Sequence, residues 1–291
     1  MKQIKSFIQL FLFLLIPVVF IFCSNTSEPK NDPYANENDI INFSLDNVPE
    51  AHVSIDKEEK TIRLLFPYRC KVDIKKLTIK FGTSMKATTN LLSGGEYDFT
   101  NPQTLIITSA SGIENKYLIS AEICSKTAIV VSDTQNDIIP LYNQNEFFQN
   151  INVVIDKAHE VGIPTYYVML TSLIINNDSS AWNLPDQLHR YDDGILIEKD
   201  NIINAFDYST ILHNSLLERG IGKVIIVGVS SMGCVIGTCR GAAELNYDVT
   251  LIRNAHGEPI GYRPESSVEL CNTTFMNENL GTLLLVNDLS F

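Results

Sequence analysis

Two patterns in the sequence predict an α/β protein: a doubly wound, mostly parallel sheet with helices on both faces, preceded by a small all-β sandwich. Over residues 125–291, strand-like apolar runs alternate with segments of helical periodicity, which is typical of a doubly wound sheet. Over residues 39–124, short runs alternate apolar and polar residues between turn-like segments, which is typical of a small antiparallel β-sandwich. An apolar run precedes both regions at the N-terminus.

The first 22 residues have the parts of a secretory signal. Two lysines precede the apolar run SFIQLFLFLLIPVVFIF, and Cys23 follows it. A cysteine at this place resembles a bacterial lipoprotein signal, so we expect lipidation of Cys23 and attachment to a membrane of the cell envelope, on its periplasmic or surface side. The bulky residues just before Cys23 keep a second interpretation open, an uncleaved anchor of about 17 residues. Residues 23–38 are polar and contain two prolines, which predicts a flexible tether.

The composition excludes some classes of function. The net charge is −12, and lysine and arginine are scattered without a basic stripe, which argues against a nucleic-acid partner. The six cysteines form no Cys-x-x-Cys pair and have no even spacing. We therefore expect no disulfide framework, no metal site and no cofactor.

The predicted sandwich spans residues 39–124. Its strands are expected at the runs NFSL, HVSID, TIRLLF, LTIKF, TLIITS and YLISAEI. With its runs INFSL, KLTI, YDFT and KYLI, this segment resembles the immunoglobulin-like modules found behind lipoprotein signals in gut Bacteroidetes, which implies a spacer or docking module. Cys70 and Cys124 can either pair in an oxidising compartment or remain two buried thiols.

The predicted α/β region spans residues 125–291. TAIVVSD reads as its first strand, residues 146–162 as a helix closed by Gly162, and IPTYYVML as the next strand. The remaining elements are a helix in YSTILHNSLLERGIG, a strand in KVIIVG, a helix and strand in CVIGTCRGAAELNYDVTLI, a helix around residues 266–279 and a strand in TLLLV.

Three reactive side chains lie at the ends of predicted strands. Asp133 ends the first strand, Lys199 ends the apolar run that begins at Ile195, and Cys234 follows KVIIVG by a short loop. Ligands of such sheets bind beyond the carboxyl ends of the strands. A carboxylate that takes a thiol proton and an ammonium that favours the thiolate would make the cysteine a nucleophile for a carbonyl carbon. Taken singly, each residue is more often a cap, a solvated charge or a small buried side chain.

The same residues carry a resemblance to a known family. VVSDTQNDI resembles the opening strand and loop of the isochorismatase-like cysteine hydrolases, in which an Asp is followed by Gln and Asp two and four positions on. Residues 199–257 are similar to that family's lysine segment, Phe-x-x-Thr-x-Leu helix, nucleophile loop and following helix and strand. CNTTFMNENLGTLLL resembles its closing helix and strand, so the resemblance covers over half of the chain.

The resemblance implies a catalytic trio of Asp133, Lys199 and Cys234. It also implies a cis peptide between Val229 and Ser230, and an oxyanion hole made by the backbone N–H groups of Ser230 and Cys234. The activity it implies is hydrolysis of a carbon–nitrogen bond, amide or ureido, of a small molecule through a thioester. Members that open vinyl ethers lack the cysteine. Other members commonly assemble, so a homo-oligomer is a further expectation.

Departures from the family pattern keep an alternative open, a catalytically idle binding or scaffold lipoprotein. Ser231 stands where the family usually has threonine, and Asn254 stands where it usually has aspartate. Residues 171–188 contain no histidine, whereas the nicotinamidase branch has an Asp-x-His metal site there, so we expect neither zinc nor nicotinamidase activity. His256 is more often structural than part of a pocket. Candidate pocket walls are Tyr166, Trp182, Tyr191, Phe206 and Met232, although for Tyr166 and Phe206 packing in the core is the favoured interpretation.

Overall fold

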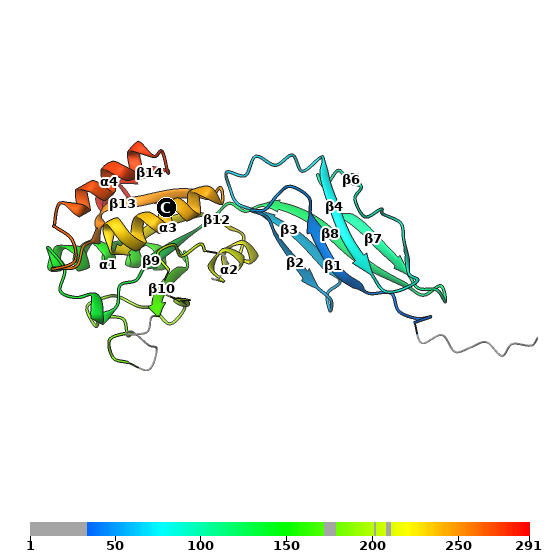
Figure 1. Cartoon of the computed structure of the whole chain (residues 1–291), viewed down its shortest axis with the longest axis horizontal. Helices are drawn as coiled ribbons and strands as arrows, with labels where there is room; N and C mark the ends of the chain where they lie inside the picture. Colours follow the sequence, from blue (N-terminus) through cyan, green and yellow to red (C-terminus); the bar gives the residue numbers. More distant parts are fainter. Residues whose placement is uncertain (1–33, 172–178, 201, 208–210) are drawn as a thin grey trace, which may run out of the picture.

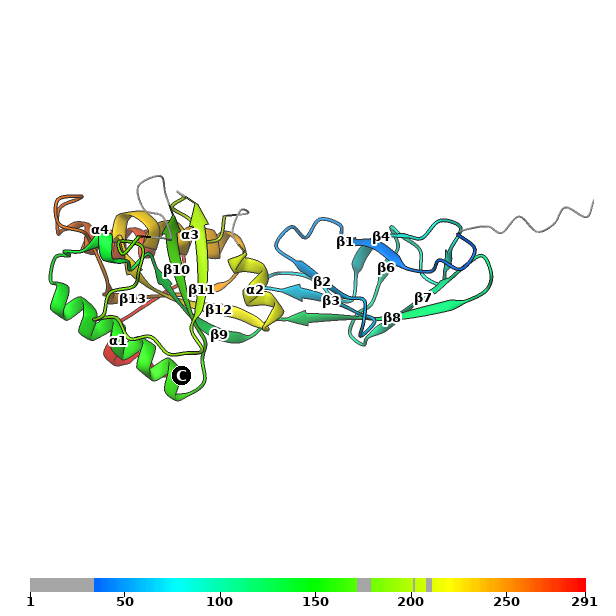
Figure 2. The ribbon, with the colours of Figure 1, turned by 90° about the horizontal axis from the view of Figure 1, so that it is seen from below.

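The computed structural model describes residues 34–171, 179–200, 202–207 and 211–291. The predicted signal at residues 1–22, Cys23 and the first part of the predicted tether lie outside these residues. Within the described ranges, no helix combines the length and the apolar character needed to cross a bilayer. Two parts lie end to end along the molecule, an all-β part and an α/β part (Figures 1 and 2).

The all-β part consists of two sheets packed face to face around one apolar core. One sheet has the order β1 (Ile40–Leu45), β4 (Leu77–Thr83) and β6 (Glu96–Tyr97). The other has the order β2 (His52–Asp56), β3 (Thr61–Phe66), β8 (Glu114–Ile123), β7 (Gln103–Thr108) and β5 (Thr88–Thr89). The sequence suggested an antiparallel sandwich, but β3 and β8 pair in parallel. Residue alternation reports which face of a strand is buried, and it carries no information on the direction of a distant partner strand.

The α/β part is built on a parallel sheet of six strands, as predicted. Its order is β11 (Ile195–Asp200), β10 (Thr165–Thr171), β9 (Lys126–Ser132), β12 (Ile221–Val229), β13 (Asp248–Gly257) and β14 (Thr282–Leu284). The central strands β9 and β12 are buried over most of their length because both faces are covered.

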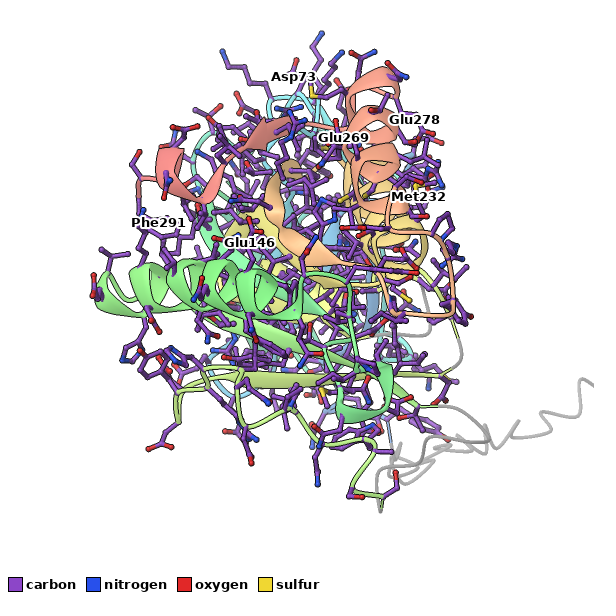
Figure 3. The ribbon with its side chains drawn as sticks, turned by 90° about the vertical axis from the view of Figure 1, so that its left-hand side faces the viewer. Asp73, Glu146, Met232, Glu269, Glu278 and Phe291 are labelled. Carbon is purple, nitrogen blue, oxygen red and sulfur yellow. The ribbon has the colours of Figure 1, made fainter. Side chains whose placement is uncertain are left out.

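Helices cover both faces of this sheet. On one face, α1 (Gln144–Glu160) packs through Phe148, Ile151 and Ile155, and the short turn η3 (Val286–Asp288) lies beside it. Gly162 adopts φ +72° just after α1, as a residue that closes a helix commonly does. On the other face lie α2 (Leu212–Glu218), α3 (Ile236–Glu244) and α4 (Ser267–Asn277). Figure 3 shows the α/β part end on, with Glu146 marking α1 and Glu269 marking α4.

Two short turns occupy the loops that the sequence predicts after β9 and β12. A 3-10 turn, η1 (Asn136–Ile138), follows Asp133. A π-turn, η2 (Ser231–Val235), precedes α3, so that Cys234 lies in an irregular turn ahead of the regular helix. Gly233 breaks the helical conformation there, with φ −123° and ψ −107°.

The two parts are joined with almost no linker. β8 ends at Ile123 and β9 begins at Lys126, and Cys124 is buried in the core of the α/β part. Cys124 Sγ donates to the Leu217 carbonyl oxygen, whereas Cys70 Sγ donates to Glu50 Oε1. Both cysteines are therefore buried free thiols, the second of the two alternatives.

Candidate active site

Asp133 lies at the carboxyl end of the central strand β9. Its backbone is in the left-handed region, with φ +44°, and its amide donates to the Val168 carbonyl oxygen on β10. Residues held in this region are found preferentially at functional sites, where the surrounding structure enforces the conformation. The side chain is 1% exposed, so its carboxylate needs a partner of opposite charge.

That partner is Lys199, which lies on the edge strand β11. β11 is separated from β9 by β10, and the lysine reaches across so that its Nζ lies 2.8 Å from Asp133 Oδ2. The same ammonium donates to the Ile203 carbonyl oxygen at 3.0 Å. Lys199 is 2% exposed, so both charges of the pair are removed from water.

Cys234 completes the group from η2, beyond the end of β12. Its thiol lies near enough to Asp133 and to Lys199 for both side chains to shift its pKa. The structure therefore brings together the three side chains that were singled out at separate strand ends.

The electrostatics of this group refine the expectation for the cysteine. Burial, followed by the negative charge of Asp133, raises the pKa of Cys234 to about 12, although Lys199 acts in the opposite direction. Burial also raises the pKa of Asp133, against the lowering effect of Lys199. The lysine alone therefore does not produce a resting thiolate, because burial and Asp133 outweigh its effect on the pKa of the thiol.

The peptide bond between Val229 and Ser230 is cis, as the family resemblance implied. We call residues 230–234 the cysteine loop. The Ser230 carbonyl oxygen accepts hydrogen bonds from the amides of Gly233 and Val235 at 3.0 and 3.1 Å, which folds the loop back on itself. Ser230 and Cys234, whose amides are the expected oxyanion donors, consequently lie on the wall of the same cavity.

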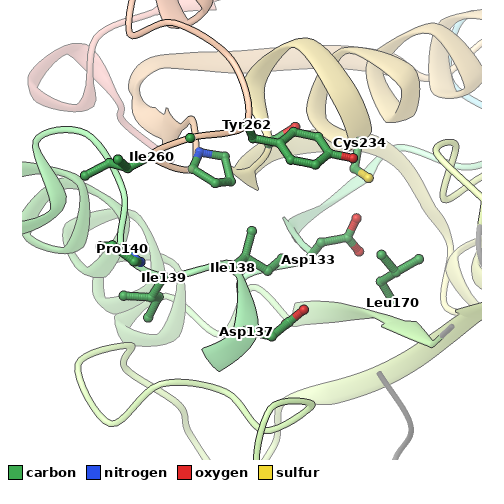
Figure 4. A pocket seen from close by; sticks show the side chains of 12 residues that line it. Asp133, Asp137, Ile138, Ile139, Pro140, Leu170, Cys234, Ile260 and Tyr262 are labelled. Carbon is green, nitrogen blue, oxygen red and sulfur yellow. The ribbon is translucent and has the colours of Figure 1, made fainter. Parts of the chain in front are cut away.

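The cavity has a volume of about 410 Å³ (Figure 4). Cys234 and Asp133 face each other at one end of it, and the Tyr262 ring lies beside Cys234 (Figure 4). Its described lining is mainly apolar and comprises Asp133, Asp137, Ile138, Ile139, Pro140, Leu170, Ser230, Cys234, Pro259, Ile260, Gly261 and Tyr262. The cavity suits a small molecule with a largely apolar body.

None of the five candidate wall residues named from the sequence is in that lining. Tyr166 and Phe206 belong to the core beneath the sheet, which was the favoured interpretation for both. Trp182 packs against the opposite core, and Tyr191 stacks on His159 with ring centroids 3.6 Å apart. Met232 packs partly against the core, and its amide donates to Glu258. Aromatic residues are common in cores as well as in pockets, so residue type alone did not separate these cases.

Sequence reasoning missed several residues near the site. Glu258 is buried and follows β13 directly, and the rule of inspecting the first residue after each strand would have found it. Arg263 and Tyr262 lie in the loop beyond it and carry no sequence signal. Asp137, by contrast, belongs to the motif that carries the family resemblance; it lines the cavity, and burial, followed by the charge of Asp133, raises the pKa of its carboxyl group.

The positions that depart from the family pattern have structural partners. Ser231 Oγ lies 2.8 Å from His256 Nδ1, and His256 Nε2 lies 3.0 Å from Asn272 Oδ1. Burial lowers the pKa of His256 to about 4, so the ring is neutral at pH 7. The Asn254 side chain accepts a hydrogen bond from the Val286 amide, which places it in the support of the C-terminal turn. Among the residues that the structure describes, no three His, Cys, Asp or Glu side chains gather as a metal site would require.

Comparisons with known proteins agree with this architecture. Residues 127–269 match the model of the isochorismatase domain, and residues 40–121 match a model described as SGBP, N-terminal. The isochorismatase family protein YddQ of Bacillus subtilis is 26% identical over 146 residues, which are 44% of this chain and 76% of YddQ.

Solved structures show the same fold. An isochorismatase from Pseudomonas putida aligns with a TM-score of 0.51 and 24% identity, over 57% of this chain and 92% of its own. N-carbamoylsarcosine amidase from Thermoplasma acidophilum aligns with a TM-score of 0.50 and 18% identity, over 57% of this chain and all of its own. The part of the chain that begins at β9 therefore has the isochorismatase-like α/β fold, and residues 127–269 within it match the model of the isochorismatase domain.

Proposed function

We propose that this protein is a cysteine hydrolase that cleaves a carbon–nitrogen bond, amide or ureido, of a small molecule. The observation that carries the proposal is that the buried Asp133 carboxylate pairs with the Lys199 ammonium and faces the Cys234 thiol at one end of a cavity of about 410 Å³. The match to the isochorismatase domain supports it, as does the likeness of the fold to N-carbamoylsarcosine amidase.

The first half of the reaction forms a thioester. Asp133 accepts the thiol proton as Cys234 Sγ attacks the carbonyl carbon, and Lys199 keeps the aspartate oriented. The amides of Ser230 and Cys234 stabilise the negative oxygen of the tetrahedral intermediate. Asp133 then gives the proton to the leaving nitrogen, the carbon–nitrogen bond breaks, and an amine or ammonia departs.

The second half returns the enzyme to its starting state. A water molecule attacks the thioester carbon and gives a proton to Asp133. The carbon–sulfur bond then breaks, and the departing thiolate takes that proton back. The free acid leaves, or a carbamate if the substrate is a ureido compound. The high pKa of the resting thiol is compatible with this cycle because sulfur is charged only while the proton is on Asp133.

A panel of small amides and ureido compounds tests the proposal. We expect wild-type protein to release amine or ammonia from at least one compound and Cys234→Ala to lose at least about a thousandfold in kcat/KM. Iodoacetamide should alkylate Cys234 in the wild type, as detected by peptide mass. Equal turnover by both proteins would reject Cys234 as the nucleophile. An unreactive Cys234 together with no turnover would favour the idle binding or scaffold lipoprotein.

We also propose that the chain is exported and tethered to the membrane through a lipid on Cys23. The support is the charged start, the apolar run and the cysteine of the first 23 residues. Expression in a bacterial host with a labelled fatty acid should label the wild type and leave Cys23→Ser unlabelled. Membrane association that persists in an unlabelled wild type with an intact N-terminus would identify an uncleaved anchor instead.

A further inference from the structure

The segment after β13 forms one wall of the cavity. We call residues 258–263 the strap. It pairs with residues 140–142: the Tyr142 amide donates to the Glu258 carbonyl oxygen at 3.2 Å, and the Ile260 amide donates to the Pro140 carbonyl oxygen at 2.9 Å. Its four central residues line the cavity, namely Pro259, Ile260, Gly261 and Tyr262. The strap is therefore fixed along one side and faces the substrate space on the other.

The two end residues of the strap contact the cysteine loop. Glu258 Oε2 accepts a hydrogen bond from the Met232 amide at 3.2 Å, and Glu258 Oε1 accepts one from Arg263 Nη1 at 3.1 Å. Arg263 Nη1 also donates to Ser230 Oγ at 3.2 Å. One ion pair thus holds the loop at Ser230 and at Met232, on both sides of Ser231.

The two residues of this ion pair differ in burial. The Glu258 side chain is fully buried, and Arg263 is 36% exposed. A glutamate is rarely buried to this degree unless it is paired, and hydrogen bonds to a charged acceptor are stronger than neutral ones. Glu258 and Arg263 therefore fix the loop from its buried side and from the rim of the cavity.

We propose that Glu258 and Arg263 are positioning residues that hold the cysteine loop in the shape that directs the Ser230 and Cys234 amides at the reacting oxygen. This inference rests on the proposed function. Oxyanion donors act only when they are held close to the position of the developing charge, and loss of one donor lowers kcat by about 10²–10³. A pair that holds the loop at Ser230 and at Met232 should affect the transition state more than the binding of the substrate.

The experiment separates this role from general support of the fold. Alkylation of Cys234 by iodoacetamide would be a substitution at carbon that needs no oxyanion hole, so its rate would report the condition of the thiol. A small aldehyde such as propanal adds the thiol across its C=O bond: a C–S bond forms, the proton moves to oxygen, and that oxygen takes the oxyanion position. Protection of Cys234 by propanal against iodoacetamide therefore measures the oxyanion site without an amide substrate.

Three variants and a control define the test. Arg263→Met removes the donor and keeps much of the side-chain volume, whereas Arg263→Lys keeps a positive charge and three donors. Glu258→Gln removes the charge of the buried partner. Glu265→Gln is the matched control, because Glu265 follows the strap and contacts Asn143, away from the cysteine loop.

We expect Arg263→Met and Glu258→Gln to weaken protection by propanal at least about tenfold and to lower kcat for a hydrolysed amide by about 10- to 100-fold. KM and the alkylation rate should stay within about twofold of wild type. Arg263→Lys should restore most of the loss, and Glu265→Gln should behave as wild type. Arg263→Met carries the test if Glu258→Gln does not fold, because Arg263 is partly exposed.

The outcomes distinguish the two proposals. Unchanged protection in Arg263→Met would overturn the positioning role, and so would an equal loss of alkylation and protection. A wild-type protein with no propanal adduct would overturn it as well, since no oxyanion site would exist to be positioned. A wild-type protein that binds propanal but hydrolyses no amide would overturn only the proposed function.

Discussion

At the scale of single residues, the site depends on charges that are buried together. Asp133 and Lys199 are each at most 2% exposed, and each is the other's partner of opposite charge. Removal of one member of such a pair leaves an uncompensated charge in the interior, which is more harmful than removal of both. The pair should therefore be visible in stability as well as in activity.

Lys199→Met should destabilise the protein by about 3–5 kcal/mol, because it leaves the Asp133 carboxylate without its cation. The double variant Asp133→Asn with Lys199→Met should recover part of that loss. Urea unfolding of the wild type, both single variants and the double variant measures the effect. A double variant whose destabilisation equals the sum of the two single values would contradict direct coupling between the two charges.

His256 should make stability depend on pH below neutrality. Burial lowers its pKa from 6.5 in the unfolded chain to about 4 in the folded one. Between these values the unfolded chain binds more protons, so stability falls as the pH falls from 6.5 to 4 and levels off below. The titration of His256 should lower the free energy of unfolding at pH 4 by an amount on the order of 3 kcal/mol relative to pH 7.

The comparison of wild type with His256→Gln tests this dependence. The difference in unfolding free energy between pH 7 and pH 4.5 should be smaller in the variant, whatever its stability at pH 7. Both proteins keep His213, whose pKa burial also lowers to about 4, so its contribution cancels in the comparison. Equal pH dependence in the two proteins would show that His256 titrates normally.

At the scale of elements, the loop after β9 is held by a side chain that extends the sheet. β9 ends at Ser132. Beyond this end, the side-chain amide of Gln135 forms hydrogen bonds with the backbone of β10, as the backbone of a further strand residue would. Its Oε1 accepts from the Leu170 amide at 2.7 Å, and its Nε2 donates to the Leu170 carbonyl oxygen at 3.1 Å and to that of Trp182 at 3.2 Å. Gln135 thus fixes the turn that presents Asp133 to the cavity.

Gln135→Ala should destabilise the protein by about 2–3 kcal/mol, because the part-buried backbone groups of Leu170 and Trp182 lose three hydrogen bonds. Asn136→Ala is the matched control. The Asn136 side-chain amide donates to the exposed Ser180 carbonyl oxygen, so the expected loss of stability is below about 0.5 kcal/mol. Denaturant unfolding of both variants measures the difference. Similar stabilities for the two would show that the Gln135 bonds do not hold the loop.

The elements themselves were largely predictable. The strand runs, the long helix ended by Gly162 and the closing helix and strand of the α/β part all occur close to their predicted places. Apolar periodicity and turn residues are local properties, so they can be read from adjacent residues. The π-turn that carries Cys234 and the parallel pairing of β3 with β8 were not predicted, because both depend on contacts with distant segments.

At the scale of the whole molecule, the all-β part is packed directly against the base of the parallel sheet. Arg63 Nη1 donates to the Glu218 carbonyl oxygen at 3.2 Å, and Lys223 Nζ lies 4.1 Å from the centroid of the Tyr68 ring. The site residues Asp133 and Cys234 follow the carboxyl ends of β9 and β12, whereas the all-β part meets the amino-terminal ends of these strands.

Gly222 should be critical for that joint. A β-carbon at this position would lie 2.1 Å from the Cys124 carbonyl oxygen and 2.7 Å from the Tyr68 amide nitrogen. Because both atoms belong to the backbone, Gly222→Ala should destabilise the protein by about 2–3 kcal/mol and lower its Tm by about 5 °C or more. Val153→Ala, on the exposed face of α1, should leave Tm nearly unchanged. An unaltered Tm in Gly222→Ala would mean that the backbone at the joint can shift to accommodate a β-carbon without loss of stability.

The sequence by itself determined which residues become strands and helices and which side chains stand at the strand ends, since these follow from local pattern and from family motifs. Asp133, Lys199 and Cys234 were identified in this way. Only the tertiary structure decided that their charges meet away from water, that burial and Asp133 raise the pKa of the thiol, and that Glu258 and Arg263 hold the cysteine loop. The physical reason is that desolvation and ion pairing depend on what surrounds a group in space, and distant segments of the chain supply those surroundings.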